Sequence, residues 1–180
     1  GPDQLSQTGR RHLAHLIRSH GLTISGLGFP TRRGFHELEK IEARLAGAQK
    51  TLALAGELGA PHIIHPMGAI PPDRQDRKTA FFFEAMNAVS REAVRVGARF
   101  AVETGLDRPE TLEKFLKETE SGGLAVHYNP ANLLPAGVDV YEQTVQRFAG
   151  SIAGLHVKDV VRSGMSVSGF REVPVGEGDV

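Results

Sequence analysis

The sequence alternates between two hydrophobic periods, and this alternation restricts the fold more than any other feature. Apolar residues recur every three or four positions, the helical period, in five segments: 5–20, 37–58, 78–96, 110–120 and 140–148. Short apolar segments between them predict strands: 22–29, 62–65, 99–103, 124–128 and 152–157. Strands separated by helices in strict succession predict a parallel sheet, and βα repeats of this kind favour a barrel.

The length of the chain allows only part of such a barrel. An eight-stranded β/α barrel takes about 250 residues, whereas this chain has 180. We therefore expect residues 1–180 to form a single α/β domain, a partial (β/α)8 barrel with about five parallel strands visible and its first and last strands missing. Open sheet edges can pair with other chains, so we also expect association, a homo-oligomer included.

Composition and charge argue against several function classes. The formal net charge is zero, so no overall field attracts nucleic acid or an anionic membrane. No apolar stretch reaches the roughly 18 residues that span a bilayer, and residues 1–20 lack the apolar block of a signal peptide. We expect a cytoplasmic protein with no nucleic-acid or membrane partner. Because cysteine is absent, a metal would be bound through His, Asp, Glu, Asn or carbonyl oxygen.

Polar side chains stand at the carboxyl ends of three predicted strands. Glu103 closes one strand, Asn129 follows the next, and His156 lies near the end of the last. Because the strands of a parallel barrel end at one mouth, these side chains can meet although they are far apart in sequence. Glu103, Asn129 and His156 are therefore candidate ligands of a metal ion.

Each of these residues also has a purely structural interpretation. Glu103 could face solvent or pair with an arginine. Asn129 precedes Pro130, and asparagine before proline is typical of a turn. His156 lies between two apolar residues and could pack in the barrel interior.

Four motifs resemble those of one known family. They are Glu-Thr-Gly at 103–105, Asn-Pro-Ala-Asn-Leu at 129–133, His-Val-Lys-Asp at 156–159 and the segment 173–180. Together they resemble the xylose isomerase-like TIM barrels, the sugar phosphate isomerase/epimerase group. That family holds a divalent cation with Glu, Asp, His and Glu after four successive strands. The resemblance implies metal-binding roles for Glu103 and His156, with Asn129 in place of the usual Asp and the last Glu beyond Val180.

The resemblance also implies a function. It predicts a divalent-metal-dependent isomerase or epimerase, with Mn, Mg, Co or Zn as the metal and a small sugar or polyol-derived substrate. Glu103 would be the catalytic acid/base residue, and the reaction would pass through an enediolate. We expect this activity from the full-length parent rather than from these 180 residues alone. Since the amide of Asn129 removes a negative charge, we also expect metal affinity to be low in this chain.

Four further residues are candidate substrate contacts. They are His65, Asn132, Lys158 and Asp159, which follow or flank the predicted strand ends. The adjacent charges of Lys158 and Asp159 suit hydrogen bonds to a substrate or to a metal ligand. The alternatives are that His65 packs in the core and that Asn132 caps a turn.

Two other function classes fit the same fold. An endonuclease IV-like metal phosphodiesterase would act on DNA, but the neutral charge and the few ligand histidines argue against it. A non-catalytic relative that binds a sugar or a partner without metal is the second alternative, and Asn129 favours it.

Overall fold

The computed structural model describes residues 2–72, 76–105, 107–164, 166 and 169–180. Its α-helices are α1 (Gln7–Ser19), α2 (Ile41–Leu58), α3 (Arg77–Val96), α4 (Pro109–Glu118) and α5 (Glu142–Phe148). Three short 3-10 turns are η1 (Pro2–Gln4), η2 (Glu120–Gly122) and η3 (Leu134–Ala136). The strands are β1 (Leu27–Gly28), β2 (His62–His65), β3 (Arg99–Glu103), β4 (Leu124–Tyr128), β5 (Ile152–Leu155), β6 (Asp159–Arg162) and β7 (Phe170–Val173).

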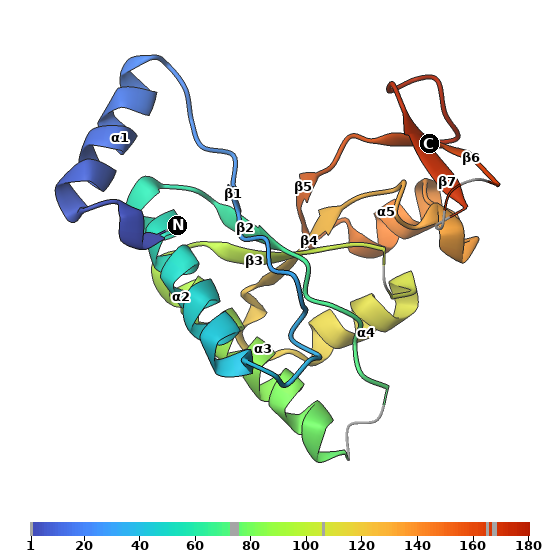
Figure 1. The fold of residues 1–180 in the computed structure, drawn as a ribbon, viewed down its shortest axis with the longest axis horizontal. Helices are drawn as coiled ribbons and strands as arrows, with labels where there is room; N and C mark the ends of the chain where they lie inside the picture. The colour runs from blue at the N-terminus through green and yellow to red at the C-terminus, as the bar shows by residue number, and fades with distance from the viewer. Residues whose placement is uncertain (1, 73–75, 106, 165, 167–168) are drawn as a thin grey trace.

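The first five strands form one parallel sheet in sequence order, β1-β2-β3-β4-β5. The sheet curls into half of a barrel, and the prediction of a partial (β/α)8 barrel is confirmed. Figure 1 shows α2, α3 and α4 together on one side of the sheet, while α1 and the β6–β7 hairpin project on the other side at opposite ends. None of the helices in the described ranges is long and apolar enough to cross a membrane.

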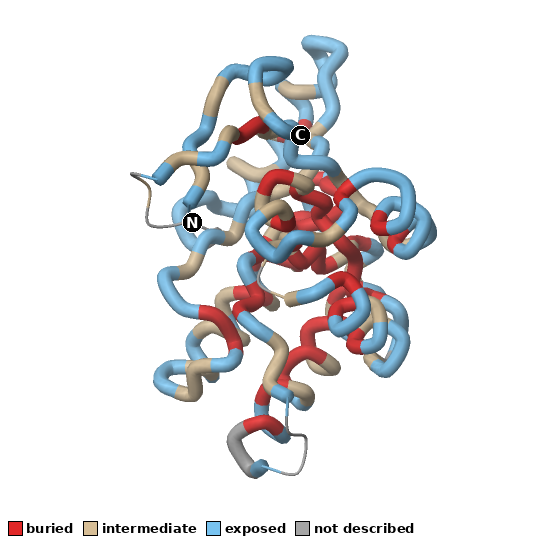
Figure 2. Tube along the Cα trace, turned by 90° about the vertical axis from the view of Figure 1, so that its right-hand side faces the viewer, coloured by how far each residue is buried: buried red, intermediate tan, exposed pale blue. Residues whose placement is uncertain are grey.

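The core lies between the sheet and the helices that cover it. Ile63, Phe100 and Val126 come from three neighbouring strands, are 0% exposed and belong to one apolar cluster with the inner helix faces. Buried residues gather in the strands and on the inner sides of the helices in Figure 2. Alternate strand residues point to opposite faces of a sheet. Glu103 and His127, which are register partners on β3 and β4, therefore lie on the concave face.

Two predicted strands are shorter in the structure. The segment 22–29 contributes only Leu27 and Gly28 to the sheet. Just before them the backbone passes close to a side chain of β2, since a Cβ atom at Gly26 would lie 2.7 Å from Nε2 of His62. The segment 152–157 pairs as a strand only to Leu155.

The antiparallel β6–β7 hairpin was not predicted. Its register pairs Asp159 with Val173 and Arg162 with Phe170. In Figure 1 it stands beyond β5, next to α5. It follows the last strand of the half-barrel directly and brings residues of the C-terminal segment near the sheet's carboxyl end. The expected homo-oligomer and the single-domain assignment stay predictions.

Candidate functional site

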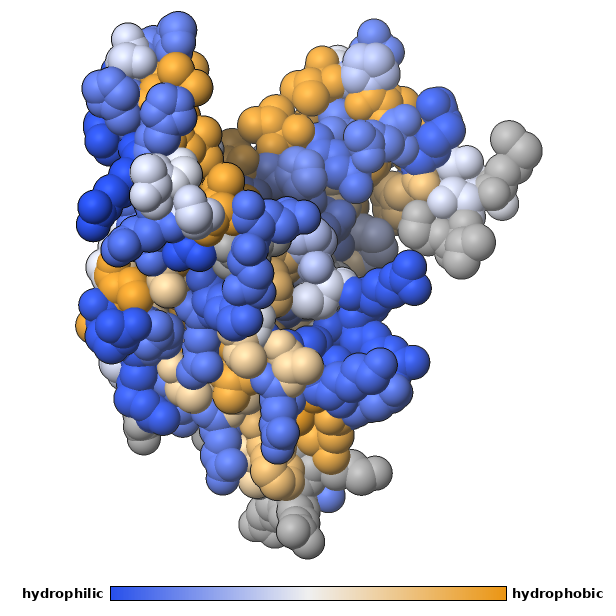
Figure 3. Space-filling view, turned by 60° about the vertical axis from the view of Figure 1, so that its left-hand side comes forward, coloured by the Kyte–Doolittle hydropathy of each residue, from blue (hydrophilic) through white to orange (hydrophobic). Residues whose placement is uncertain are grey.

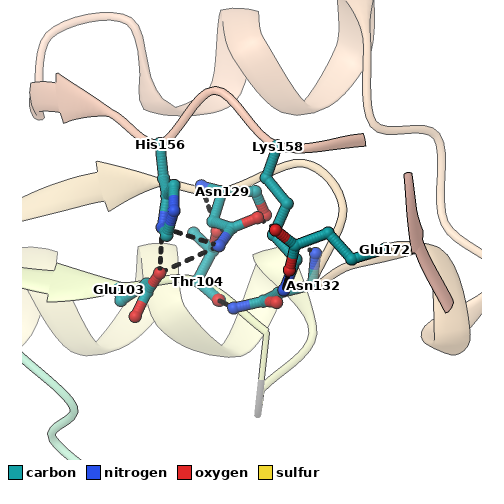
Figure 4. A network of polar contacts seen from close by, with 7 residues as sticks. All are labelled: Glu103, Thr104, Asn129, Asn132, His156, Lys158 and Glu172. Carbon is teal, nitrogen blue, oxygen red and sulfur yellow. Dashed lines mark hydrogen bonds and ion pairs between the residues drawn. The ribbon is translucent and has the colours of Figure 1, made fainter. Parts of the chain in front are cut away.

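Glu103, Asn129 and His156 form a compact cluster at the carboxyl ends of β3, β4 and β5. The amide nitrogen of Asn129 donates to Oε1 of Glu103 over 2.9 Å, and Nδ1 of His156 also lies 2.9 Å from this oxygen. Nδ2 of Asn129 and Nδ1 of His156 are 3.2 Å apart. Figure 4 shows the three side chains pointing toward one another. The expectation that these residues meet at one mouth agrees with this geometry.

Thr104 fixes the backbone of Asn129. Its hydroxyl donates to the carbonyl of Asn129 over 2.9 Å and accepts from the Asn129 N–H over 2.8 Å. The side-chain oxygen of Asn129 in turn accepts the backbone N–H of Asn132 over 3.2 Å. With only 1% of its surface exposed, Asn129 is held on every polar atom of its side chain and by both backbone groups.

The surroundings of Glu103 favour its ionised form. Burial by itself would raise the pKa of this carboxyl, but hydrogen bonds from Asn129 and His156 outweigh burial and leave the pKa below its usual value. His127, the register partner of Glu103, is also close, and its ring centre lies 6.1 Å from that of His156. Burial lowers the pKa of His127, while the charge of Glu103 partly opposes that shift. The lowered pKa favours the neutral form of His127 beside the Glu103 carboxylate.

Glu103 lies on the walls of two hollows. One is a cavity of about 550 Å³, whose lining includes Glu103, Asn132 and Lys158. The other, of about 630 Å³, lies on the concave side of the sheet and is lined partly by His127 and His156. Figure 3 shows that the surface is hollowed at the top of the molecule and that apolar side chains lie on both sides of this hollow. A small molecule in either space could reach the Glu103 carboxylate.

The predicted substrate contacts Asn132 and Lys158 both lie at the first cavity. The Asn132 amide donates to the carbonyl of Thr104 over 3.2 Å. Nζ of Lys158 is 3.5 Å from a carboxylate oxygen of Glu172, which belongs to β7. Sequence reasoning missed Thr104 and Glu172 as parts of the site. Thr104 belongs to the Glu-Thr-Gly motif and so carried a signal, whereas Glu172 carried none because its hairpin was not predicted.

The predicted ligand set does not fit a divalent metal as it stands. In the described ranges, no group of three or more His, Cys, Asp or Glu side chains is placed to hold a metal ion. Glu103 and His156 are two typical ligands, but the third member, Asn129, donates its N–H to Glu103 and places its amide nitrogen, not its oxygen, 3.2 Å from Nδ1 of His156. An amide nitrogen that donates a hydrogen bond has no lone pair for a cation. The oxygen of Asn129, which could bind one, is turned toward Asn132.

His65 was predicted to contact substrate, but the structure places it in the apolar core. Its side chain is 0% exposed, and its ring centre lies 5.0 Å from those of Phe29 and Phe35 and 5.2 Å from that of Phe100. It has the same parity on β2 as Ile63, which faces the helices. Nε2 of His65 lies 3.2 Å from the hydroxyl of Thr31.

We expect His65 to make the stability of the protein depend on pH. Burial, and next the charge of Arg44, lower the pKa of His65 from 6.5 to about 4. As the pH falls, His65 is therefore protonated in the unfolded chain at a higher pH than in the folded protein. The contribution of neutral His65 to the free energy of unfolding is complete above pH 6.5. It amounts to about 3 kcal/mol and is lost as the pH falls from 6.5 toward 4. Urea unfolding of the wild type and His65→Gln at pH 7 and pH 5 measures the difference.

The control for this measurement is His12→Gln, because His12 is exposed on α1. This variant should lose as much unfolding free energy between pH 7 and pH 5 as the wild type, while His65→Gln loses less. Equal losses in all three proteins would contradict the assignment of the pH dependence to His65.

Asp159 was the other predicted substrate contact, and the structure gives it a different role. Its side chain is buried and accepts the backbone N–H groups of Val160, Gly176, Gly178 and Val180 over 2.8 to 3.0 Å. The bond from Val180 contributes most to lowering its pKa, and together these bonds outweigh burial. With its oxygens used in this way, Asp159 holds the C-terminal turn against the start of β6.

Replacing Asp159 by Asn should loosen this turn. An amide has one acceptor oxygen, and its NH2 group would face backbone N–H donors. We expect hydrogen exchange at the Gly176 and Gly178 amides to become about ten-fold faster, or more. Exchange measured by NMR or mass spectrometry tests this, with Glu177→Gln as the control because Glu177 is exposed in the same turn. Unchanged exchange in Asp159→Asn would show that the carboxylate does not hold the turn.

Comparisons with known proteins place the chain in a family. The family model described as the xylose isomerase-like TIM barrel matches residues 1–180. A solved xylose isomerase domain protein from Planctomyces limnophilus is similar, with a TM-score of 0.85 and 18% identity over 97% of this chain and 68% of that one. A xylose isomerase-like TIM barrel protein from Mycobacterium smegmatis, solved in complex with magnesium, has a TM-score of 0.71 and 18% identity over 98% of this chain and 65% of that one.

An L-ribulose 3-epimerase structure is also similar, with a TM-score of 0.70 and 18% identity over 94% of this chain and 58% of that one. The chain thus spans between 58% and 68% of the length of these three proteins. A comparison with curated protein sequences gave no significant match. The solved structures support the fold, and the family model covers the whole sequence. The chain belongs to the xylose isomerase-like TIM barrel family.

Proposed function

We propose that the full protein is an isomerase or epimerase of a small sugar or polyol-derived ketone, and that Glu103 is its proton-transfer residue. The observation that carries this proposal is the position of Glu103. Its carboxylate is kept ionised by two nitrogen neighbours and lies on the wall of a cavity of about 550 Å³. Membership of the xylose isomerase-like TIM barrel family supports the choice of reaction, and so does the similarity of this chain to an L-ribulose 3-epimerase structure.

In the proposed step, Glu103 takes the proton from a carbon next to the substrate carbonyl. The electron pair of the broken C–H bond forms a carbon–carbon double bond, and the carbonyl electrons move to its oxygen, which gives an enediolate. A proton from water on the other face of the same carbon inverts it, which is epimerisation, and Glu103 then gives its proton to water. Return of the Glu103 proton to the neighbouring carbon, with transfer of the hydroxyl proton to the former carbonyl oxygen, moves the carbonyl, which is isomerisation. No oxidant or reductant is consumed.

The other residues position Glu103 and the substrate. Asn129 and His156 hold one carboxylate oxygen, so we assign proton acceptance to the second oxygen, Oε2, which has no hydrogen-bond partner among the described residues. Asn132 and Lys158 line the same cavity and are proposed to hydrogen-bond substrate hydroxyl or carbonyl groups. A divalent metal would supply a Lewis acid for the carbonyl oxygen. Because the arrangement of Glu103, Asn129 and His156 does not fit such an ion, the step is assigned to these side chains alone.

The test is uptake of solvent deuterium at the carbon beside the carbonyl. The full-length protein is incubated in D2O with a panel of free and phosphorylated ketoses, and the products are followed by proton NMR and chromatography. Loss of the C–H signal together with a new isomer supports the proposal. Binding of a sugar without exchange or isomer formation would overturn it in favour of a non-catalytic sugar-binding protein.

A further inference from the structure

One oxygen of Glu103 has two nitrogen neighbours at the same distance. Nδ2 of Asn129 and Nδ1 of His156 each lie 2.9 Å from Oε1. A carboxylate oxygen accepts hydrogen bonds and does not donate them, so both nitrogens act as N–H donors toward Oε1. Figure 4 shows both contacts reaching the same oxygen from the ends of two different strands. The negative charge is thus compensated by two N–H dipoles from the chain itself.

Rotating the side-chain amide of Asn129 by 180° would cost free energy. In the present orientation its nitrogen donates to Glu103 and its oxygen accepts from the backbone N–H of Asn132. A rotation by 180° would set the amide oxygen against the Glu103 carboxylate and the NH2 group against the Asn132 N–H. Both contacts would be repulsive, and the buried Asn129 amide would lose both of its hydrogen bonds. Thr104 holds the backbone of Asn129 from both sides, so the segment cannot shift to relieve them.

A cation at this place would need the opposite arrangement. It would require the amide oxygen of Asn129, a lone pair on the imidazole and an oxygen of Glu103 to face one point. Here the amide nitrogen faces that point, and the proton on Nδ1 of His156 occupies the lone pair that is directed at Glu103. Two N–H groups therefore fill the space next to Oε1 in which a metal would bind.

We propose that Asn129 is a positioning residue that takes the place of a divalent cation. Its N–H group and that of His156 hold the Glu103 carboxylate with no metal bound, and the side chain at position 129 decides whether the cluster binds a metal. The inference concerns the same site as the proposed function but is independent of the substrate, because metal binding is measured without any turnover.

The test is the metal affinity of the full-length protein and of Asn129→Asp. Both proteins are freed of metal and titrated with Mn²⁺ by isothermal calorimetry. Aspartate replaces the donor by an anionic oxygen ligand beside Glu103 and His156, so we expect the variant to bind Mn²⁺ at least about ten-fold more tightly than the wild type. Equal affinity in the two proteins would overturn the proposal.

Asn132→Asp is the matched control. It adds the same charge in the same segment, but the Asn132 amide donates to the carbonyl of Thr104 rather than to Glu103. We expect it to raise the affinity for Mn²⁺ much less than Asn129→Asp does. An equal rise in both variants would mean that charge alone attracts the ion, which would overturn a specific role for Asn129.

A measurement on the wild type keeps the proposal testable even where Asn129→Asp does not fold. Nitrogen-15 NMR of the metal-free protein should show His156 protonated at Nδ1, and this signal should not change on addition of Mg²⁺. A shift of the His156 signal at stoichiometric Mg²⁺ would show that the wild-type cluster binds the ion, which would also overturn the proposal.

Discussion

Replacing Glu103 by Gln should lower the turnover of the full protein on the proposed ketone substrate by about 10²- to 10⁴-fold, the usual contribution of a general base. Glutamine has nearly the same shape but cannot accept a proton. Substrate binding should change much less, because Asn132 and Lys158 line the cavity independently of this carboxylate. The expected result is therefore a large fall in kcat with a small change in KM.

Deuterium exchange at the substrate carbon measures this effect directly, since it reports the proton transfer rather than a later step. The control is Glu57→Gln. Glu57 lies on α2, an element other than β3, and pairs with Arg10 of α1 at the surface. Surface pairs of this kind contribute little to stability. Full exchange activity in Glu103→Gln would show that another group is the base.

The half-barrel could be predicted because its signals are local. Each helix and each strand of the sheet has its own hydrophobic period, and strict alternation leaves a parallel sheet as the simple solution. The cluster followed from the same signal. Glu103, Asn129 and His156 stand at three strand ends, and parallel topology brings such ends together.

The position of His65 could have been predicted from its parity. Ile63 is apolar and faces the helices, so His65, two residues later, points the same way. The role of Asp159 could not. Its partners at 176–180 lie beyond a hairpin whose strands are separated by residues 163–169 rather than by a two-residue turn, and only the folded structure shows that they return to the carboxylate.

The direction of the Asn129 amide was also beyond the sequence. The sequence shows that an amide stands at position 129, where a carboxylate would bind a cation. Either the oxygen or the nitrogen of this amide could face Glu103. The backbone N–H of Asn132 settles the choice by engaging the oxygen. This position depends on the turn after β4, in which Thr104 holds the backbone of Asn129 and the N–H of Leu133 donates to the carbonyl of Pro130 over 3.0 Å.

Replacing Phe100 by Ala should destabilise the protein by about 3 to 5 kcal/mol, the range for a large aromatic side chain removed from a core. Phe100 is 0% exposed on the central strand β3, and its ring lies near those of Phe35 and His65. Closing the resulting space would require the neighbouring Phe35 and His65 rings to move. Urea unfolding at pH 7 measures the loss. Phe81→Ala is the control, because Phe81 is 45% exposed on α3 and should cost much less; equal losses would show that the core does not centre on β3.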